Sequence, residues 1–182
     1  HALTAELLRG TCRVDRHLPD AHRRVLGGPL ERELECIFTP GHAPGHLCFF
    51  ERRTGAMIVG DMVASVGSII IDPSEGDMAA YLDSLRRIRD RKPRILLPAH
   101  GFVISDPQAI IEQYLAHRLM RESRVLAALS AESQSLETLV LKVYHDTPSV
   151  LHGLAQRSLL SHLMKLAEEA RASKTASGWS LG

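Results

Sequence analysis

Residues 39–46 read TPGHAPGH, so two histidines, His42 and His46, stand four positions apart with glycine and proline between them. Proline lacks a backbone donor and clashes inside a helix, so this composition excludes a regular helical His pair. Apolar runs at 36–38 and 47–50 flank the stretch. The sequence therefore predicts a rigid loop between two strands, which would fix imidazole rings before a metal ion arrives. Taken alone, the stretch leaves open a plain turn without any ligand.

The bulk composition narrows the class of protein. A chain of 182 residues can hold one medium domain or two small ones, and a formal net charge of +1 gives no electrostatic reason to expect a polyanion partner. We find no apolar run long enough to span a membrane and no signal-peptide pattern, so no membrane partner is expected. Three scattered cysteines, Cys12, Cys36 and Cys48, do not suggest a disulfide framework. They favour a reducing, cytoplasmic setting, with Cys36 and Cys48 packed in the core.

Periodicity and turn residues predict the elements of the first part of the chain. The expected elements are a helix at 2–9, a loop at 12–30, and strands at 33–38, 47–51, 56–60, 68–71 and 94–97. A helix is expected at 77–91, because Asp77 is a suitable N-cap and apolar residues recur along one face. The outer face of this helix is basic, but Asp83 and Asp90 interrupt the charge. We interpret it as a solvated surface rather than a nucleic-acid patch.

The composition changes after Ser105-Asp106-Pro107, and we place a domain boundary near residue 106. Asp106 followed by proline predicts the start of a long helix at 107–129. Further helices are expected at 135–145 and 148–171, followed by a hairpin at 173–181. The predicted domains are therefore residues 1–106 and residues 107–182.

Three residues that suit metal binding follow predicted strands. His42 comes just after one strand, Asp61 ends the run Val59-Gly60-Asp61, and His100 ends a strand within residues 97–101. Groups at strand ends converge on one rim in sheet-based enzymes. Two imidazoles and one carboxylate suit zinc, manganese or iron, and a carboxylate can bridge two cations.

Taken together, TPGHAPGH (39–46), GD (60–61) and LPAHG (97–101) resemble, in order and spacing, the motifs of the metallo-β-lactamase superfamily. The resemblance implies an αββα sandwich with a binuclear metal site, two zinc ions being expected and manganese or iron the alternatives. It implies that His42 binds one metal, that His100 binds the other, and that Asp61 bridges both and helps to position the attacking hydroxide. His46 falls on the second histidine of the family loop, and we expect it to support the site rather than bind metal.

The second half of the chain resembles one branch of this superfamily. Tyr114 to Glu122, Leu139 to Tyr144 and Leu159 to Leu166 are similar to the branch with a C-terminal winged-helix-like domain. That branch includes a lactamase-like endoribonuclease and many bacterial hydrolases, with glyoxalase II-like enzymes as further relatives. The predicted fold class is α/β (α+β): the C-terminal part of an αββα sandwich, followed by a small helical winged-helix-like domain.

One departure from the family pattern limits the prediction. The motif His-x-His-x-Asp-His, which supplies several metal ligands in the family, is absent from residues 1–182. His1 is either its last histidine or a residue just beyond it, and the simplest expectation is the C-terminal part of a longer enzyme. We therefore expect this chain alone to bind metal weakly or not at all and to be inactive.

The function implied by the resemblance is metal-assisted hydrolysis of an ester, thioester, lactam or phosphodiester. A small-molecule substrate is the expected partner. Nucleic-acid contact through the helix that carries Gln156, Arg157 and Ser158 is the alternative, but this helix has no clear basic stripe. A wall of the substrate cleft or a homodimer surface is the favoured expectation for the helical domain. Two other functions stay open: an RNA-processing nuclease of the same fold, and a noncatalytic relative that acts in binding or assembly.

Overall fold

The computed structural model describes residues 20–21, 23–26 and 32–182 of the chain. The helix predicted at 2–9, Cys12 and most of the loop predicted at 12–30 lie outside the described residues. Within that loop, Arg23–Leu26 forms strand β1, so the prediction is wrong there. β1 pairs antiparallel with the next strand, Arg32–Phe38, and this pairing gives its backbone groups partners that the local sequence does not predict.

A five-stranded sheet with the order β1-β2-β3-β4-β5 forms the first part of the molecule. The remaining strands are β2 (Arg32–Phe38), β3 (Leu47–Glu51), β4 (Ala56–Gly60) and β5 (Ile95–Pro98). Neighbouring strands are antiparallel except for β4 and β5, which are parallel. The structure confirms the strands predicted at 33–38, 47–51, 56–60 and 94–97. It does not confirm a strand at 68–71, because this segment is not paired in the sheet. The carbonyl groups of residues 69–71 accept hydrogen bonds from side chains instead.

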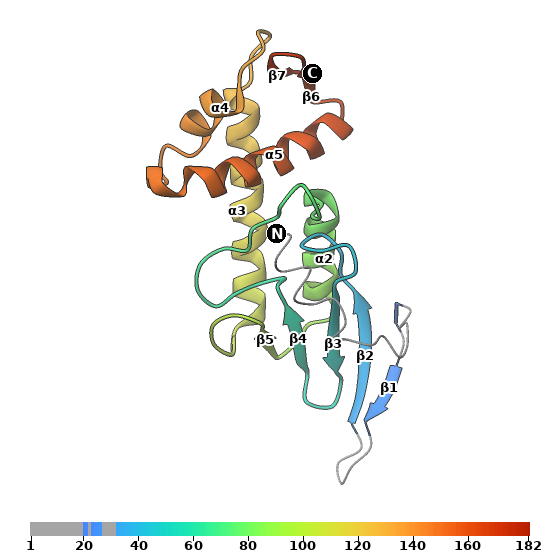
Figure 1. Ribbon diagram of the computed structural model, residues 1–182. Helices are drawn as coiled ribbons and strands as arrows, with labels where there is room; N and C mark the ends of the chain where they lie inside the picture. Colours follow the sequence, from blue (N-terminus) through green and yellow to red (C-terminus); the bar gives the residue numbers. More distant parts are fainter. Residues whose placement is uncertain (1–19, 22, 27–31) are drawn as a thin grey trace, which may run out of the picture.

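Two helices pack with this sheet around the first core (Figure 1). Helix α2 (Met78–Asp90) is capped by Asp77, whose side chain accepts a hydrogen bond from the Ala80 amide, as predicted. Helix α3 (Pro107–Ala128) is capped in the same way by Asp106, with proline at the first helical position. The sheet contributes buried residues such as Ile37 and Cys48 to this core. Cys36 is buried as well, so the predicted packing of both cysteines is confirmed.

The C-terminal part consists of two further helices and a small hairpin (Figure 1). Its elements are α4 (Leu136–Val143), a 3₁₀ turn (Ser149–Leu151), α5 (His152–Glu168), β6 (Ala172–Thr175) and β7 (Gly178–Leu181). The predicted helices and hairpin are confirmed, although the last helix begins as a 3₁₀ turn. Among the described residues, no helix is long and apolar enough to cross a membrane.

Helix α3 belongs to both halves of the structure. Its first turns place Ile111 and Leu115 in the core beneath the sheet, and Val125 near its end lies in a second core with Leu163 and Trp179. Figure 1 shows this helix running from the sheet to the C-terminal helices. The boundary near residue 106 stays a prediction, but the two halves are joined by one continuous helix.

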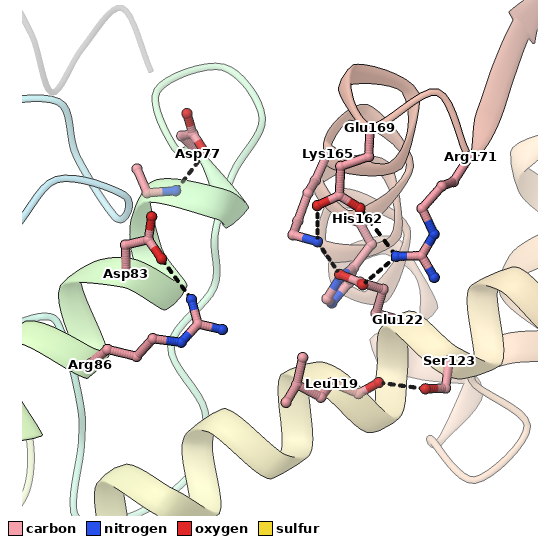
Figure 2. Close-up of polar contacts among 11 residues, drawn as sticks. Asp77, Asp83, Arg86, Leu119, Glu122, Ser123, His162, Lys165, Glu169 and Arg171 are labelled. Atoms are coloured by element: carbon pink, nitrogen blue, oxygen red, sulfur yellow. Dashed lines mark hydrogen bonds and ion pairs between the residues drawn. The ribbon is translucent and has the colours of Figure 1, made fainter.

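A cluster of charged side chains links the C-terminal end of α5 to α3 and lies around His162 (Figure 2). Its members are Glu122, Lys165, Glu169 and Arg171. The Lys165 ammonium lies 2.8 Å from Glu122 Oε2 and 2.7 Å from Glu169, and Arg171 Nη1 lies 3.4 Å and 3.2 Å from the same two carboxylates. His162 itself is fully buried, and neither ring nitrogen has a hydrogen-bond partner. Burial, together with the nearby cations Arg118 and Lys165, lowers the pKa of His162 to about 3. The ring is therefore neutral, and its 4.0 Å approach to Glu122 is not an ion pair at neutral pH.

The stability of the protein is expected to fall on mild acidification because of His162. Below the ordinary histidine pKa of 6.5, the unfolded chain binds a proton at this position that the folded chain binds only near pH 3. The neutral, buried His162 ring therefore makes its full contribution to the free energy of unfolding above pH 6.5. This contribution is lost as the pH falls toward 3. Between about pH 7.5 and pH 5 this loss amounts to about 2 kcal/mol. Urea unfolding should be measured at both pH values. The free energy of unfolding should fall by about 2 kcal/mol less in His162→Leu than in the unmodified chain. The exposed control His145→Leu should lose as much as the unmodified chain, and equal losses in all three proteins would contradict the assignment.

Candidate metal centre

The loop predicted to carry the histidines is held at both ends and against α2. The Thr39 amide donates to the His46 carbonyl (3.0 Å), which closes the loop, and the Asp77 amide donates to the Gly41 carbonyl (2.8 Å). Gly41 has φ +130°, and a Cβ there would lie 2.3 Å from the backbone of Tyr81. Only glycine allows so close an approach, so Gly41 lets the loop lie directly against the helix.

His42 presents one ring nitrogen to the site and has the other occupied. Its Nδ1 lies 3.1 Å from the Ile70 carbonyl, which can only accept, so Nδ1 must carry the proton. In the neutral ring Nε2 then keeps its lone pair, and this atom lies 3.9 Å from Asp61 Oδ2. A neutral imidazole with a protonated Nδ1 bound to a carbonyl is the form in which histidine commonly binds metals.

Asp61 and His100 meet because β4 and β5 run in the same direction. Their carboxyl ends lie at one edge of the sheet, where the Ala99 amide donates to the Gly60 carbonyl (2.9 Å). His100 Nε2 lies 3.4 Å from Asp61 Oδ1, and the His100 side chain is 76% exposed. The structure thus brings together the three residues selected from the sequence, and the two imidazoles face different oxygens of one carboxylate.

The chemistry of these donors fits a divalent ion. Tetrahedral zinc with bonds of about 2.0–2.1 Å holds its ligand atoms about 3.3–3.4 Å apart, close to the 3.4 Å between His100 and Asp61. The 3.9 Å gap on the His42 side is wider. Within the described ranges, no three His, Cys, Asp or Glu side chains are arranged to hold one ion. The three donors therefore match two partial sites that share a carboxylate, rather than one closed site.

His46 lies behind Asp61 and contacts its backbone. The Asp61 amide donates to His46 Nε2 (3.3 Å), so Nδ1 carries the proton and meets Thr39 Oγ1 (2.8 Å). The Thr39 hydroxyl then donates to Cys48 Sγ (3.3 Å). Burial of the ring, and next the neighbouring His42, lower the pKa of His46, which favours this neutral form. These contacts are the ones that a supporting role requires, and that role stays a prediction.

Several residues that shape the site carry no local signal in the sequence. Ser65 Oγ accepts a hydrogen bond from the Phe102 amide (2.7 Å) and thereby fixes the loop that carries His100. Gly101, at φ +90°, leaves room for this hydroxyl, since a Cβ there would lie 2.1 Å from it. The sequence predicts a strand at 68–71, but in the structure this segment presents the Ile70 carbonyl to His42. Only spatial proximity identifies these residues, because each lies far along the chain from its partner.

Comparison with known proteins identifies the family. Residues 4–100 match the model of the metallo-beta-lactamase superfamily, and residues 135–179 match the beta-lactamase associated winged helix domain. Because the first match covers more than half of the chain, this protein belongs to the metallo-beta-lactamase superfamily. Both the resemblance and the predicted fold class are confirmed. Members of the superfamily are generally metal-dependent hydrolases.

The chain is similar to eukaryotic lactamase-like proteins. It is 32% identical over 151 residues to lactamase-like protein nscB of Arthroderma benhamiae, covering 75% of this chain and 34% of the relative. It is 33% identical over 145 residues to the beta-lactamase-like protein 2 homolog of Drosophila melanogaster, covering 77% and 48%. This chain thus spans about half the length of these curated relatives or less.

Two solved structures share the fold. A beta-lactamase domain protein from Burkholderia ambifaria superposes with a TM-score of 0.82 at 22% identity, covering 98% of this chain and 56% of that one. A metallo-beta-lactamase family protein from Thermus thermophilus gives a TM-score of 0.76 at 24% identity, covering 91% and 54%. At this level of identity the likeness establishes the fold alone.

Gly60 tests how tightly the site is built. It adopts φ +51°, and a Cβ there would lie 2.6 Å from His46 Nε2. Gly60→Ala should therefore push His46 away from Asp61 and lower the free energy of unfolding by about 1–3 kcal/mol. Gly153→Ala is the matched control, because Gly153 lies in α5 with nothing within 4 Å of the added carbon. Urea unfolding should show no loss in the control, and equal stability of the two variants would contradict this reading of the site.

Proposed function

We propose that this chain supplies one half of the binuclear site of a metal-dependent hydrolase, with zinc as the metal. The observation that carries the proposal is the single carboxylate of Asp61 between the Nε2 atoms of His42 and His100. One oxygen facing each imidazole is the arrangement that a bridging carboxylate needs. A noncatalytic relative would not require this arrangement, so the hydrolase is the better account. Manganese and iron remain alternatives, because the same donors suit them.

In this reaction the residues of this chain would bind the metal ions, fix their positions and balance their charge. His42 and His100 would offer lone pairs from neutral rings, and Asp61 would offer both oxygens. His46 would keep the Asp61 backbone in place through its amide contact. Bound divalent ions would supply Lewis acidity and lower the pKa of a bound water toward neutrality. An ester, thioester, lactam or phosphodiester would then be hydrolysed by water, without a covalent enzyme intermediate.

The structure offers little support for a thiol nucleophile near this site. Cys48 is fully buried, and burial raises the pKa of its thiol to about 12. The thiolate, which is the reactive form, is therefore scarce at neutral pH. Cys48 acts instead as an acceptor for the Thr39 hydroxyl.

Metal content tests the incomplete half-site directly. Three donors without the His-x-His-x-Asp-His motif should hold zinc weakly, because each ion lacks most of its ligands. After dialysis against zinc-free buffer, the 182-residue chain should retain fewer than about one zinc ion per chain by elemental analysis. It should also show no hydrolase activity. Two tightly retained zinc ions would overturn this expectation.

Asp61 can be tested in a longer polypeptide that carries the His-x-His-x-Asp-His motif before these residues. In a panel of ester, thioester, lactam and phosphodiester substrates with zinc or manganese, Asp61→Asn should lower kcat/KM by at least about 100-fold, because an amide bridges cations poorly. Asp83→Asn is the control, an acidic residue on the exposed face of α2. Full activity in Asp61→Asn would refute the proposed role.

A small-molecule substrate is the partner that we propose, in a cytoplasmic protein. The basic residues of α5 are largely neutralised by carboxylates: Arg157 lies 2.7 Å from Asp72, and Lys165 contacts Glu122 and Glu169. This pairing leaves little charge for a phosphate backbone. RNA binding that weakens with salt would favour the nuclease alternative instead. A homodimer formed through the helical domain remains a proposal, which sedimentation would test.

A further inference from the structure

Segment 68–72 lies between the candidate metal site and the C-terminal helices, and three of its successive carbonyl groups are held by side chains. The Ile69 carbonyl accepts a hydrogen bond from Arg118 Nη2. The Ile70 carbonyl accepts from His42 Nδ1 (3.1 Å), and the Ile71 carbonyl accepts from Ser161 Oγ (2.6 Å). The outer two of these carbonyls thus bind the C-terminal helices, and the middle one binds the metal-site histidine.

The C-terminal helices hold this segment at further points. Arg118, on α3, also approaches Ser68 Oγ (3.4 Å), and its guanidinium lies over the Tyr81 ring at 5.4 Å. At the other end, Arg157 on α5 pairs with Asp72 at 2.7 Å. Just before the segment, Tyr114 on α3 donates to the Gly67 carbonyl (3.3 Å). The segment is thus fastened along its whole length to the two helices.

Arg118 carries a charge that is buried between the two parts of the structure. It is 2% exposed, and in the described part of the chain its charged group contacts no carboxylate. Burying a cation that lacks a counter-ion is unfavourable and is normally offset by strong hydrogen bonds. Here the hydrogen bonds of Nη2 go to the segment that holds His42, whereas Nε has no hydrogen-bond partner in the described part of the chain.

We infer that Ser161 and Arg118 are positioning residues for His42, and that they act through the carbonyl groups of segment 68–72. By fixing the Ile69 and Ile71 carbonyls, they aim the Ile70 carbonyl at His42 Nδ1. That contact places the proton on Nδ1 and leaves Nε2 free to bind metal. The inference rests on the proposed role of His42 as a ligand, and it makes the C-terminal domain a structural part of the metal site.

The tautomer of His42 reports this positioning without any metal. In the metal-free 182-residue chain at about pH 8, a long-range ¹H–¹⁵N spectrum distinguishes Nδ1–H from Nε2–H, and His42→Gln identifies the signals. The unmodified chain should show His42 in the Nδ1–H form. Ser161→Ala should shift the ratio of the two tautomers by about five-fold toward Nε2–H, the change expected for one lost hydrogen bond.

Ser123→Ala is the matched control. It removes a serine hydroxyl that donates to a backbone carbonyl, that of Leu119, on the exposed side of α3 (Figure 2). A merely structural effect would appear as lower thermal stability without any change in the His42 signals. An unshifted tautomer ratio in folded Ser161→Ala, or an equal shift in Ser123→Ala, would overturn the inference. The Asp61→Asn activity test is independent of this result, so failure of the hydrolase proposal would be recognised separately.

Discussion

The parallel pairing of β4 with β5 is the contact on which the rest of the site depends. If the two strands were antiparallel, Asp61 and His100 would lie at opposite edges of the sheet. Parallel neighbours need a crossover connection, and here α2 provides it. The same helix holds the loop at 39–46, because the amide of its capping residue Asp77 donates to the Gly41 carbonyl and Ser84 donates to the Pro40 carbonyl. One crossover therefore places all three candidate ligands at one edge.

The C-terminal domain contributes to this arrangement rather than being merely attached to it. Helix α3 supplies side chains to both cores, so the domain cannot turn freely relative to the sheet. Contacts from α3 and α5 then reach segment 68–72, next to His42. Under the proposed function, these contacts give the winged-helix-like domain a structural task beside the candidate metal site, that of holding segment 68–72.

The histidines show how position, rather than residue type, decides chemistry. His162 is buried beside cations and stays neutral next to the second core. His46 is partly buried, and its two nitrogens are bound to the Asp61 amide and the Thr39 hydroxyl. His42 keeps one nitrogen free, and His100 is largely exposed. Only the last two have a nitrogen that faces the Asp61 carboxylate, which is why they are the candidate ligands.

The sequence by itself determined the order of most strands and helices, the caps at Asp77 and Asp106, and the three candidate ligands. These features depend on local patterns: alternation, capping and glycine beside a ligand. The sequence did not reveal β1, a four-residue strand within a mostly polar stretch that pairs with β2. It also suggested a strand at 68–71, an apolar run that the tertiary structure uses differently, with its carbonyls bound by His42, Arg118 and Ser161. Such contacts join residues up to 90 positions apart, and no local pattern can encode them. Tertiary structure alone therefore decided how the candidate ligands are held in place.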